Sequence, residues 1–223
     1  MRFILVIGFA LFYFGAHSQV SNDYMTWVTV GADGKIMKGL KWSANFNARF
    51  NSEGVKKLFP QVGLEYKVTK WFRPGIEYRF IYDKNQYGNY KTSSSLRVNL
   101  GFQHVIDKRL KIGARLRYQY STAHSINPEY DDGLDHLVRI KQAVSYDIND
   151  FFLTPDLSVE FFINPTSGIV TPGFTKIRYA LGLRLDLKSP HSIKVKYRLD
   201  QRLTRLPEMR LRHIVGVSYG YSF

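Results

Sequence analysis

Arginine and lysine side chains recur at alternate positions along many segments of this 223-residue chain. Alternate side chains of an extended strand point to the same face, so this spacing collects the cations on one surface. Two kinds of chemistry fit such a surface. Rings of Arg and Lys favour the passage of anions through a pore, whereas the same cations interleaved with carboxylates can fill an interior as ion pairs. We prefer the filled interior and keep the anion pore as the alternative.

These charged residues are expected to line the lumen of a barrel, because Arg or Lys facing lipid costs about 2–4 kcal/mol near the membrane midplane. The expected basic lumen residues are Arg73, Arg79, Arg97, Arg115, Arg117, Arg139, Lys141, Arg178, Arg184, Lys194, Lys196 and Arg198. The expected acidic lumen residues are Glu77, Asp156, Glu160, Asp186 and Asp200.

Histidines offer a second kind of chemistry, since a hydrolase needs a general base beside a nucleophile or water. Beyond the N-terminal segment they are His104, His124, His136, His191 and His213. His136 and His213 are expected near the outer ends of their strands, where a lipid- or peptide-cleaving site would lie. No serine lies within two residues of His213, and no Gly-x-Ser-x-Gly motif occurs. We therefore predict no enzyme and keep an outer-membrane hydrolase as the runner-up.

No cofactor or metal site is expected. The acidic segment 129–135 could hold Ca²⁺, but it lacks the regular ligand spacing of a dedicated loop. A net charge of +14 makes nucleic acid a standing hypothesis. The aromatic and basic residues alternate on opposite faces, however, whereas a single-strand platform needs them on one. We therefore expect no nucleic-acid partner.

The N-terminus reads as a secretory signal peptide over residues 1–18, with Arg2 followed by the apolar run 3–14 and small residues at Ala16 and Ser18. The apolar run is shorter than the ~20 residues of a spanning helix. The chain has no cysteine, so disulfides, thiolate chemistry and a lipid-anchoring cysteine are excluded.

Strict alternation of apolar and polar residues predicts β-strands through most of residues 19–223. In 176–187, for example, Ile177, Tyr179 and Leu181 share one face, whereas Arg178 and Arg184 share the other. Strands are expected at 40–51, 59–68, 72–83, 95–105, 109–120, 136–148, 151–163, 176–187, 192–202 and 211–223. Most are longer than the ~5–6 residues of a typical globular strand and match the ~9–11 that cross a bilayer.

The connections alternate between short and long, as in a membrane barrel with short periplasmic turns and long outer loops. Long loops are expected at 51–58, 84–91, 121–135, 164–175 and 205–210. Residues 24–31 form an eleventh candidate strand with poor alternation, followed by a turn at 32–35. Because bacterial barrels normally have even strand numbers, we expect ten strands, or twelve as the alternative.

The final segment alternates apolar side chains up to Tyr219, Tyr221 and the terminal Phe223. A last strand ending in an aromatic residue resembles the signal that outer-membrane barrel assembly machinery reads. The alternative is an ordinary buried terminal strand.

Several short motifs occur in a fixed order, densest after residue 115: RYQ at 117–119, VRIK at 138–141, LTP at 153–155, EFF at 160–162, IRYALGL at 177–183, HSI at 191–193, YR at 197–198, PE at 207–208 and HIVGVSYGYSF at 213–223. Over about residues 20–223 the chain resembles the outer-membrane barrels of Bacteroidota grouped under domain of unknown function 2490. The resemblance implies a location and a fold, and it carries no activity.

The sequence thus predicts an all-β, antiparallel up-and-down transmembrane barrel in the outer membrane of a Gram-negative bacterium. We expect a monomer, with outer-membrane lipid and the barrel assembly machinery as partners. Its expected role is structural or that of a small pore. A soluble periplasmic barrel that binds an apolar ligand would turn the same pattern inside out and is the third hypothesis.

Overall fold

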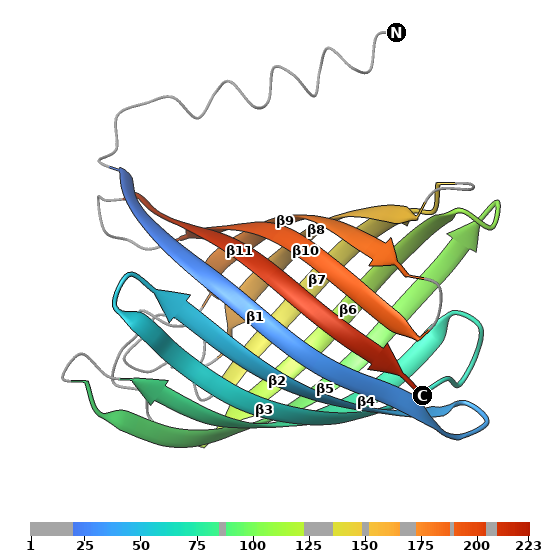
Figure 1. Ribbon diagram of the computed structural model, residues 1–223, viewed down its shortest axis with the longest axis horizontal. Coiled ribbons are helices and arrows are strands. Elements are labelled where there is room, and N and C mark those ends of the chain that lie inside the picture. The colour runs from blue at the N-terminus through green and yellow to red at the C-terminus, as the bar shows by residue number, and fades with distance from the viewer. Residues whose placement is uncertain are drawn as a thin grey trace, which may run out of the picture.

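Eleven strands form one closed barrel in the computed structural model (Figure 1). The structure describes residues 20–84, 88–122, 136–148, 152–165, 173–187, 190–203 and 209–223. The strands are β1 (Val20–Met37), β2 (Leu40–Asn51), β3 (Gly54–Tyr66), β4 (Phe72–Lys84), β5 (Tyr90–Ile106), β6 (Leu110–Ser121), β7 (His136–Tyr146), β8 (Leu153–Asn164), β9 (Gly173–Asp186), β10 (His191–Arg202) and β11 (Met209–Ser222). The predicted signal peptide lies outside the described residues. Within them, no helix has the length and apolar character to cross a membrane.

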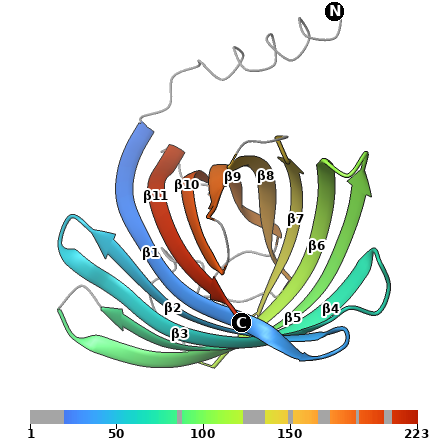
Figure 2. The same ribbon diagram turned by 45° about the vertical axis from the view of Figure 1, so that its right-hand side comes forward.

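The predicted count of ten strands, with twelve as the alternative, was wrong. Residues 20–37 are a full strand that pairs with β2 on one side and with β11 on the other, with Val28 opposite Val217 in the second pair. In an up-and-down barrel with an odd number of strands, the first and last strands run in the same direction. The β1–β11 pair is therefore parallel, and every other pair is antiparallel (Figure 2).

The poor alternation of β1 has a local cause. Its inward face carries the uncharged residues Met25, Trp27, Thr29 and Gly31. The backbone of each pairs with a residue of the neighbouring strand β11. The expected turn at 32–35 is part of the strand, and the chain turns instead at Lys38 and Gly39.

The two ends of the barrel differ. At the turn end, the C-terminus and the turns at 38–39, 67–71 and 107–109 lie together (Figure 1). At the loop end, β1, β5, β7, β9 and β11 begin and β4, β6, β8 and β10 end. The turn at Asp107 and Lys108 has positive φ at both residues, which matches the right-handed twist of the flanking strands.

The expected long loop at 51–58 was also wrong, because only Ser52 and Glu53 separate β2 from β3. The Asn51 side chain accepts a hydrogen bond from the backbone N–H of Glu53 (3.1 Å), and Gly54 takes the left-handed conformation that this tight connection needs. A bulge opposite Arg49 and Phe50 follows, and both Lys56 and Lys57 are buried there.

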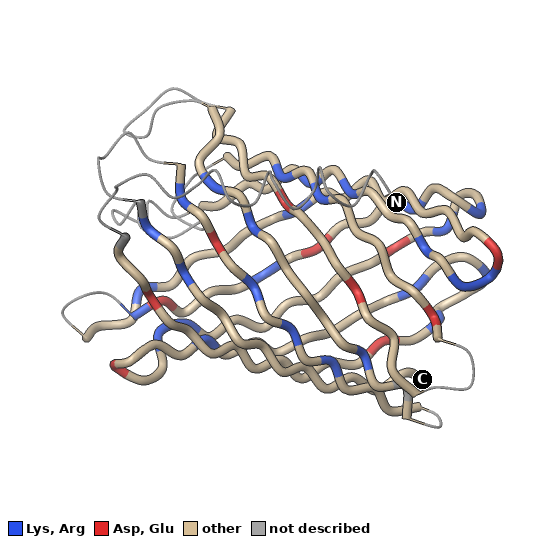
Figure 3. The backbone as a smooth tube through the Cα atoms, turned by 90° about the horizontal axis from the view of Figure 1, so that it is seen from above, with Lys and Arg blue, Asp and Glu red and all other residues tan. Residues whose placement is uncertain are grey.

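Inside and outside alternate along each strand as the pleat requires. Val62, Leu181 and Val217 are among the many large apolar side chains exposed on the outer face, whereas Arg97, Arg117 and Glu160 are buried. Figure 3 shows Lys and Arg recurring along the strands through the length of the barrel, with fewer Asp and Glu between them.

Candidate functional site

A cavity of about 220 Å³ lies inside the barrel, and nine cationic side chains line it with one carboxylate, Glu160. The cations come from six strands, so only closure of the barrel brings them together. They are Arg49, Arg79, Arg115, Arg117, Arg139, Lys141, Arg178, Lys196 and Arg198. The uncharged lining includes Trp27, Phe59 and Ser158.

Glu160 holds one wall of this cavity together. Its carboxylate accepts hydrogen bonds from Arg115 Nη2 at 2.9 Å and from Arg139 Nη2 at 2.9 Å. The side chains of Glu160 and Arg139 are mostly buried, whereas 31% of the Arg115 side chain is exposed. Hydrogen bonds between ionised groups of this kind are stronger than neutral ones, and they fix two neighbouring strands against β8.

Glu77 and Asp200 form similar centres on other strands. Glu77 accepts hydrogen bonds from Arg117 Nη2 (2.7 Å), Asn99 Nδ2 (3.0 Å) and Gln61 Nε2 (3.1 Å). Asp200 accepts from Lys176 Nζ (3.0 Å) and from Arg178 Nε (2.5 Å). The interior is therefore a set of carboxylates, each shared by several donors.

The ion pair between Lys196 and Asp156 shows why glycine occurs on the inward face. Lys196 donates to the Asp156 carboxylate beside Gly182. A Cβ on Gly182 would overlap that carboxylate and would lie 2.9 Å from Lys196 Cε. Glycine leaves room for two charged side chains to meet across the strand that carries it.

Much of the loop half of the interior is closely packed, and a separate hollow of about 200 Å³ near the loop end is lined by residues that include Asp23, Asp200 and Arg212. Lys57, Phe59, Ile81, Arg97, Gln119, Leu137, Phe162 and Ile214 are all at most 2% exposed. Aromatic rings and cations stack there, with Lys176 Nζ 3.9 Å from the ring centre of Phe162 and the Arg79 guanidinium 3.9 Å from that of Phe59. Apolar and charged side chains together fill most of this half of the barrel.

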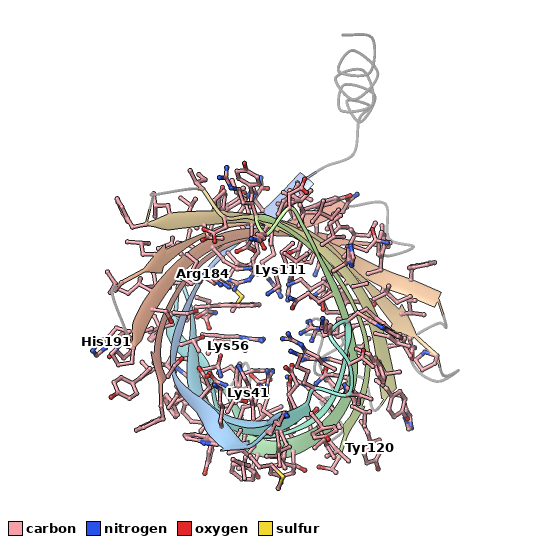
Figure 4. All side chains as sticks on the ribbon, turned by 90° about the vertical axis from the view of Figure 1, so that its right-hand side faces the viewer. Lys41, Lys56, Lys111, Tyr120, Arg184 and His191 are labelled. Atoms are coloured by element: carbon pink, nitrogen blue, oxygen red, sulfur yellow. The ribbon has the colours of Figure 1, made fainter. Side chains whose placement is uncertain are left out.

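The turn half is more open. Figure 4 shows Lys41, Lys111 and Arg184 pointing into the barrel; Lys41 and Lys111 are exposed to solvent although they face inward. The Arg73–Glu65 pair lies in the same half, with Nη1 and Oε1 3.9 Å apart and half of the Glu65 side chain exposed. Inward-facing side chains thus change from buried to exposed between the loop end and the turn end.

Most of the charged residues singled out from the sequence meet in this interior. Eight of the twelve basic residues line the cavity, and Arg97 lies in the packed loop half. Arg184 stands directly opposite Lys194 in the turn half, and Arg73 lies in that half too. The backbone of Asp186 pairs with Ser192, and its side chain is not described.

Sequence reasoning missed the apolar and aromatic part of the interior. Trp27 lies under three guanidinium groups, with Arg49, Arg198 and Arg178 at 4.1, 4.9 and 5.0 Å from its ring. Ile81, Leu137 and Phe162 fill the loop half. One signal could have found them: each breaks the alternation by standing next to another apolar residue, as Phe162 does beside Phe161.

The histidines singled out as candidate bases lie on the outer face and contact tyrosines. Tyr118 Oη lies 2.6 Å from His136 Nδ1, and Tyr197 Oη lies 2.6 Å from His213 Nδ1. His191 makes the same contact with Tyr219 (2.6 Å) and points outward in Figure 4. His124 and the acidic segment 129–135 lie outside the described residues.

The C-terminal aromatics lie at the turn end beside the β1–β11 seam. The rings of Tyr221 and Phe223 are 4.7 Å apart, and Phe223 also contacts Trp42 at 5.9 Å. The backbone N–H of Phe223 donates to the carbonyl of Asp33 (2.8 Å). The last residues are thus tied to the first strand.

The fold and interior define a closed up-and-down β-barrel with a cavity lined mainly by cations. The chain belongs to a family described as proteins of unknown function, DUF2490, whose model matches residues 25–219. The family predicted from the sequence motifs is thereby confirmed. No curated protein matches the chain.

Proposed function

We propose that the protein is a structural β-barrel of a Gram-negative outer membrane, as expected for barrels of Bacteroidota. One observation carries the proposal: large apolar side chains are exposed over the outer face of every strand. Soluble monomers rarely expose contiguous apolar patches larger than a few hundred Å². Exposure of this apolar outer face is favourable in lipid, and we propose membrane lipid as its partner.

Strand length supports the same proposal. The strands contain between 11 and 18 residues, which is enough to cross the hydrocarbon core of a bilayer at the usual tilt. Aromatic residues gather on the outer face at the turn end, where Trp71 stacks on Phe102 with 6.1 Å between the rings. Membrane barrels carry such aromatic girdles at their interfaces. We further propose that Tyr219, Tyr221 and Phe223 serve as the signal for the assembly machinery.

The packed loop half favours a barrel that does not conduct over an open anion pore. The buried side chains of Arg97, Phe59 and Phe162 occupy the section that an ion would have to cross. His136 and His213 contact tyrosines on the outer face, and His213 Nε2 also lies 3.2 Å from Asn22 Oδ1. None of these partners is a serine or a carboxylate, so the contacts do not favour a hydrolase. The proposed role is therefore that of a non-catalytic, monomeric envelope barrel.

Cell fractionation and gel migration test the location together. The protein should be recovered with the outer membrane, and the folded barrel should migrate differently on a gel before and after heating. The C-terminal double variant Tyr221→Ser with Phe223→Ser should reduce the folded, heat-modifiable form, with Tyr66→Ser as a control on the same face. Recovery of the parent chain in the soluble periplasm would contradict the proposal.

A further inference from the structure

The cationic cavity carries an excess of charge that the ion pairs do not explain. Arg115 stands directly opposite Lys141 in the β6–β7 register, and Arg117 stands opposite Arg139. Like charges placed directly opposite each other on a sheet are destabilising. A purely structural interior would be more stable with a carboxylate or an uncharged residue in one position of each pair.

The cavity also offers donors without acceptors. The indole Nε1 of Trp27, Nε of Arg115 and Nη1 of Arg198 are buried and have no hydrogen-bond partner among the described residues. All three side chains line the cavity, although they come from β1, β6 and β10. Leaving a buried donor unsatisfied costs free energy, more so when it is charged. Three such donors around one cavity suit a ligand that is rich in acceptor oxygens.

The size of the cavity limits that ligand. A volume of about 220 Å³ corresponds to roughly seven water molecules at ~30 Å³ each. Pockets for drug-sized molecules are larger, at ~300–1,000 Å³. Guanidinium groups bind phosphate oxygens through paired N–H donors, and an anion with several charges would offset several cations at once.

We propose that this cavity binds a compact oxyanion of the phosphate class carrying more than one negative charge, which enters from the turn end. The fully buried side chains lie in the loop half, whereas cationic Lys41, Lys111 and Arg184 point into the more exposed turn half (Figure 4). These outer cations attract an anion toward the cavity, and Arg198, Lys141 and Trp27 hold it there. The site goes beyond a structural role and does not depend on where the barrel resides.

Trp27 provides the measurement, because its ring contacts Arg49, Arg178 and Arg198. The chain has three tryptophans, and the double variant Trp42→Phe with Trp71→Phe leaves Trp27 as the single reporter. The folded protein in detergent would be titrated with sodium pyrophosphate and, separately, with sodium chloride at matched ionic strength. We expect a saturable change in Trp27 fluorescence with pyrophosphate and no saturable change with chloride.

Variants in this background locate the site. Arg198→Gln and Lys141→Gln should each weaken pyrophosphate binding at least about tenfold, as expected for loss of a charged hydrogen-bond donor. Arg198→Lys keeps the charge and should give an intermediate affinity. Lys38→Gln, at an exposed turn position, is the matched control and should leave the affinity unchanged.

Absence of a saturable signal in the folded reporter protein would overturn the proposal, as would an equal response to chloride. So would a Lys38→Gln variant that weakens binding as much as the cavity variants do. If Arg198→Gln does not fold, Lys141→Gln and Arg198→Lys decide the result. Fractionation tests the membrane location separately, so binding can fail while the location holds.

Discussion

Glu160 is the residue on which the cavity wall most depends. It is buried between Arg115 and Arg139 and accepts hydrogen bonds from both. The carboxylate shared by the two guanidinium groups stabilises the folded barrel mainly by compensating their positive charges. Its removal therefore costs more than its presence contributes.

Glu160→Gln should lower the free energy of unfolding by about 3 kcal/mol, because it leaves the mostly buried Arg139 and the partly exposed Arg115 without their shared carboxylate. Glu65→Gln is the matched control. Its pair with Arg73 spans 3.9 Å and is half exposed, so the expected loss is below ~1 kcal/mol. Denaturant unfolding of both variants in detergent measures the difference. Equal midpoints for the two would contradict the importance of the Glu160 centre.

At the scale of the element, β1 decides how the barrel closes. Its outward residues Tyr24, Val28 and Val30 are exposed like those of the other strands, whereas Met25 is buried inside. The parallel pair with β11 continues for fourteen residue pairs, from Val20–Met209 to Asp33–Ser222. Thus β1 is a full member of the wall.

Paired cysteines can test this seam, since the chain has none of its own. Val28→Cys combined with Val217→Cys should form a disulfide, because adjacent strands lie ~4.8 Å apart and disulfides join Cα atoms ~4.4–6.8 Å apart. The control is Val28→Cys with Tyr221→Cys, which stands four residues further along β11, roughly 13 Å away. Mobility on a non-reducing gel reports the link. Cross-linking in the control alone, or in neither protein, would rule out this register.

At the scale of the whole molecule, the barrel has one packed half and one open half. Because the strand number is odd, the chain enters at the loop end and finishes at the turn end (Figure 1). If the proposed membrane location holds and short turns face the periplasm, as in membrane barrels, the more exposed half of the interior faces the periplasm.

Accessibility of interior positions tests this asymmetry. Ser218 faces inward in the turn half, and Ser95 faces inward in the loop half with no exposed surface. In the folded protein, Ser218→Cys should react readily with a negatively charged thiol reagent, whereas Ser95→Cys should react only after unfolding. Equal rates for both would mean that the interior is open from end to end.

The sequence by itself determined the strand pattern, the family and the charged face. A period of two is a local property of the chain, so the ranges expected for β2 and β10 agree with the structure to within a residue. The spacing also identified eight cations of the cavity without any coordinates. The alternation did not predict how the two edge strands, β1 and β11, would pair.

Only the tertiary structure decided the strand number, the packed half and the cavity. Closure is a long-range property, since β1 and β11 lie at opposite ends of the chain and their pairing leaves no local signal. The interior positions of Trp27 and Phe162 depend on neighbours from other strands, which stack cations on both rings. Alternation assigns a side chain to a face, but the register between strands decides which charges meet and where space remains.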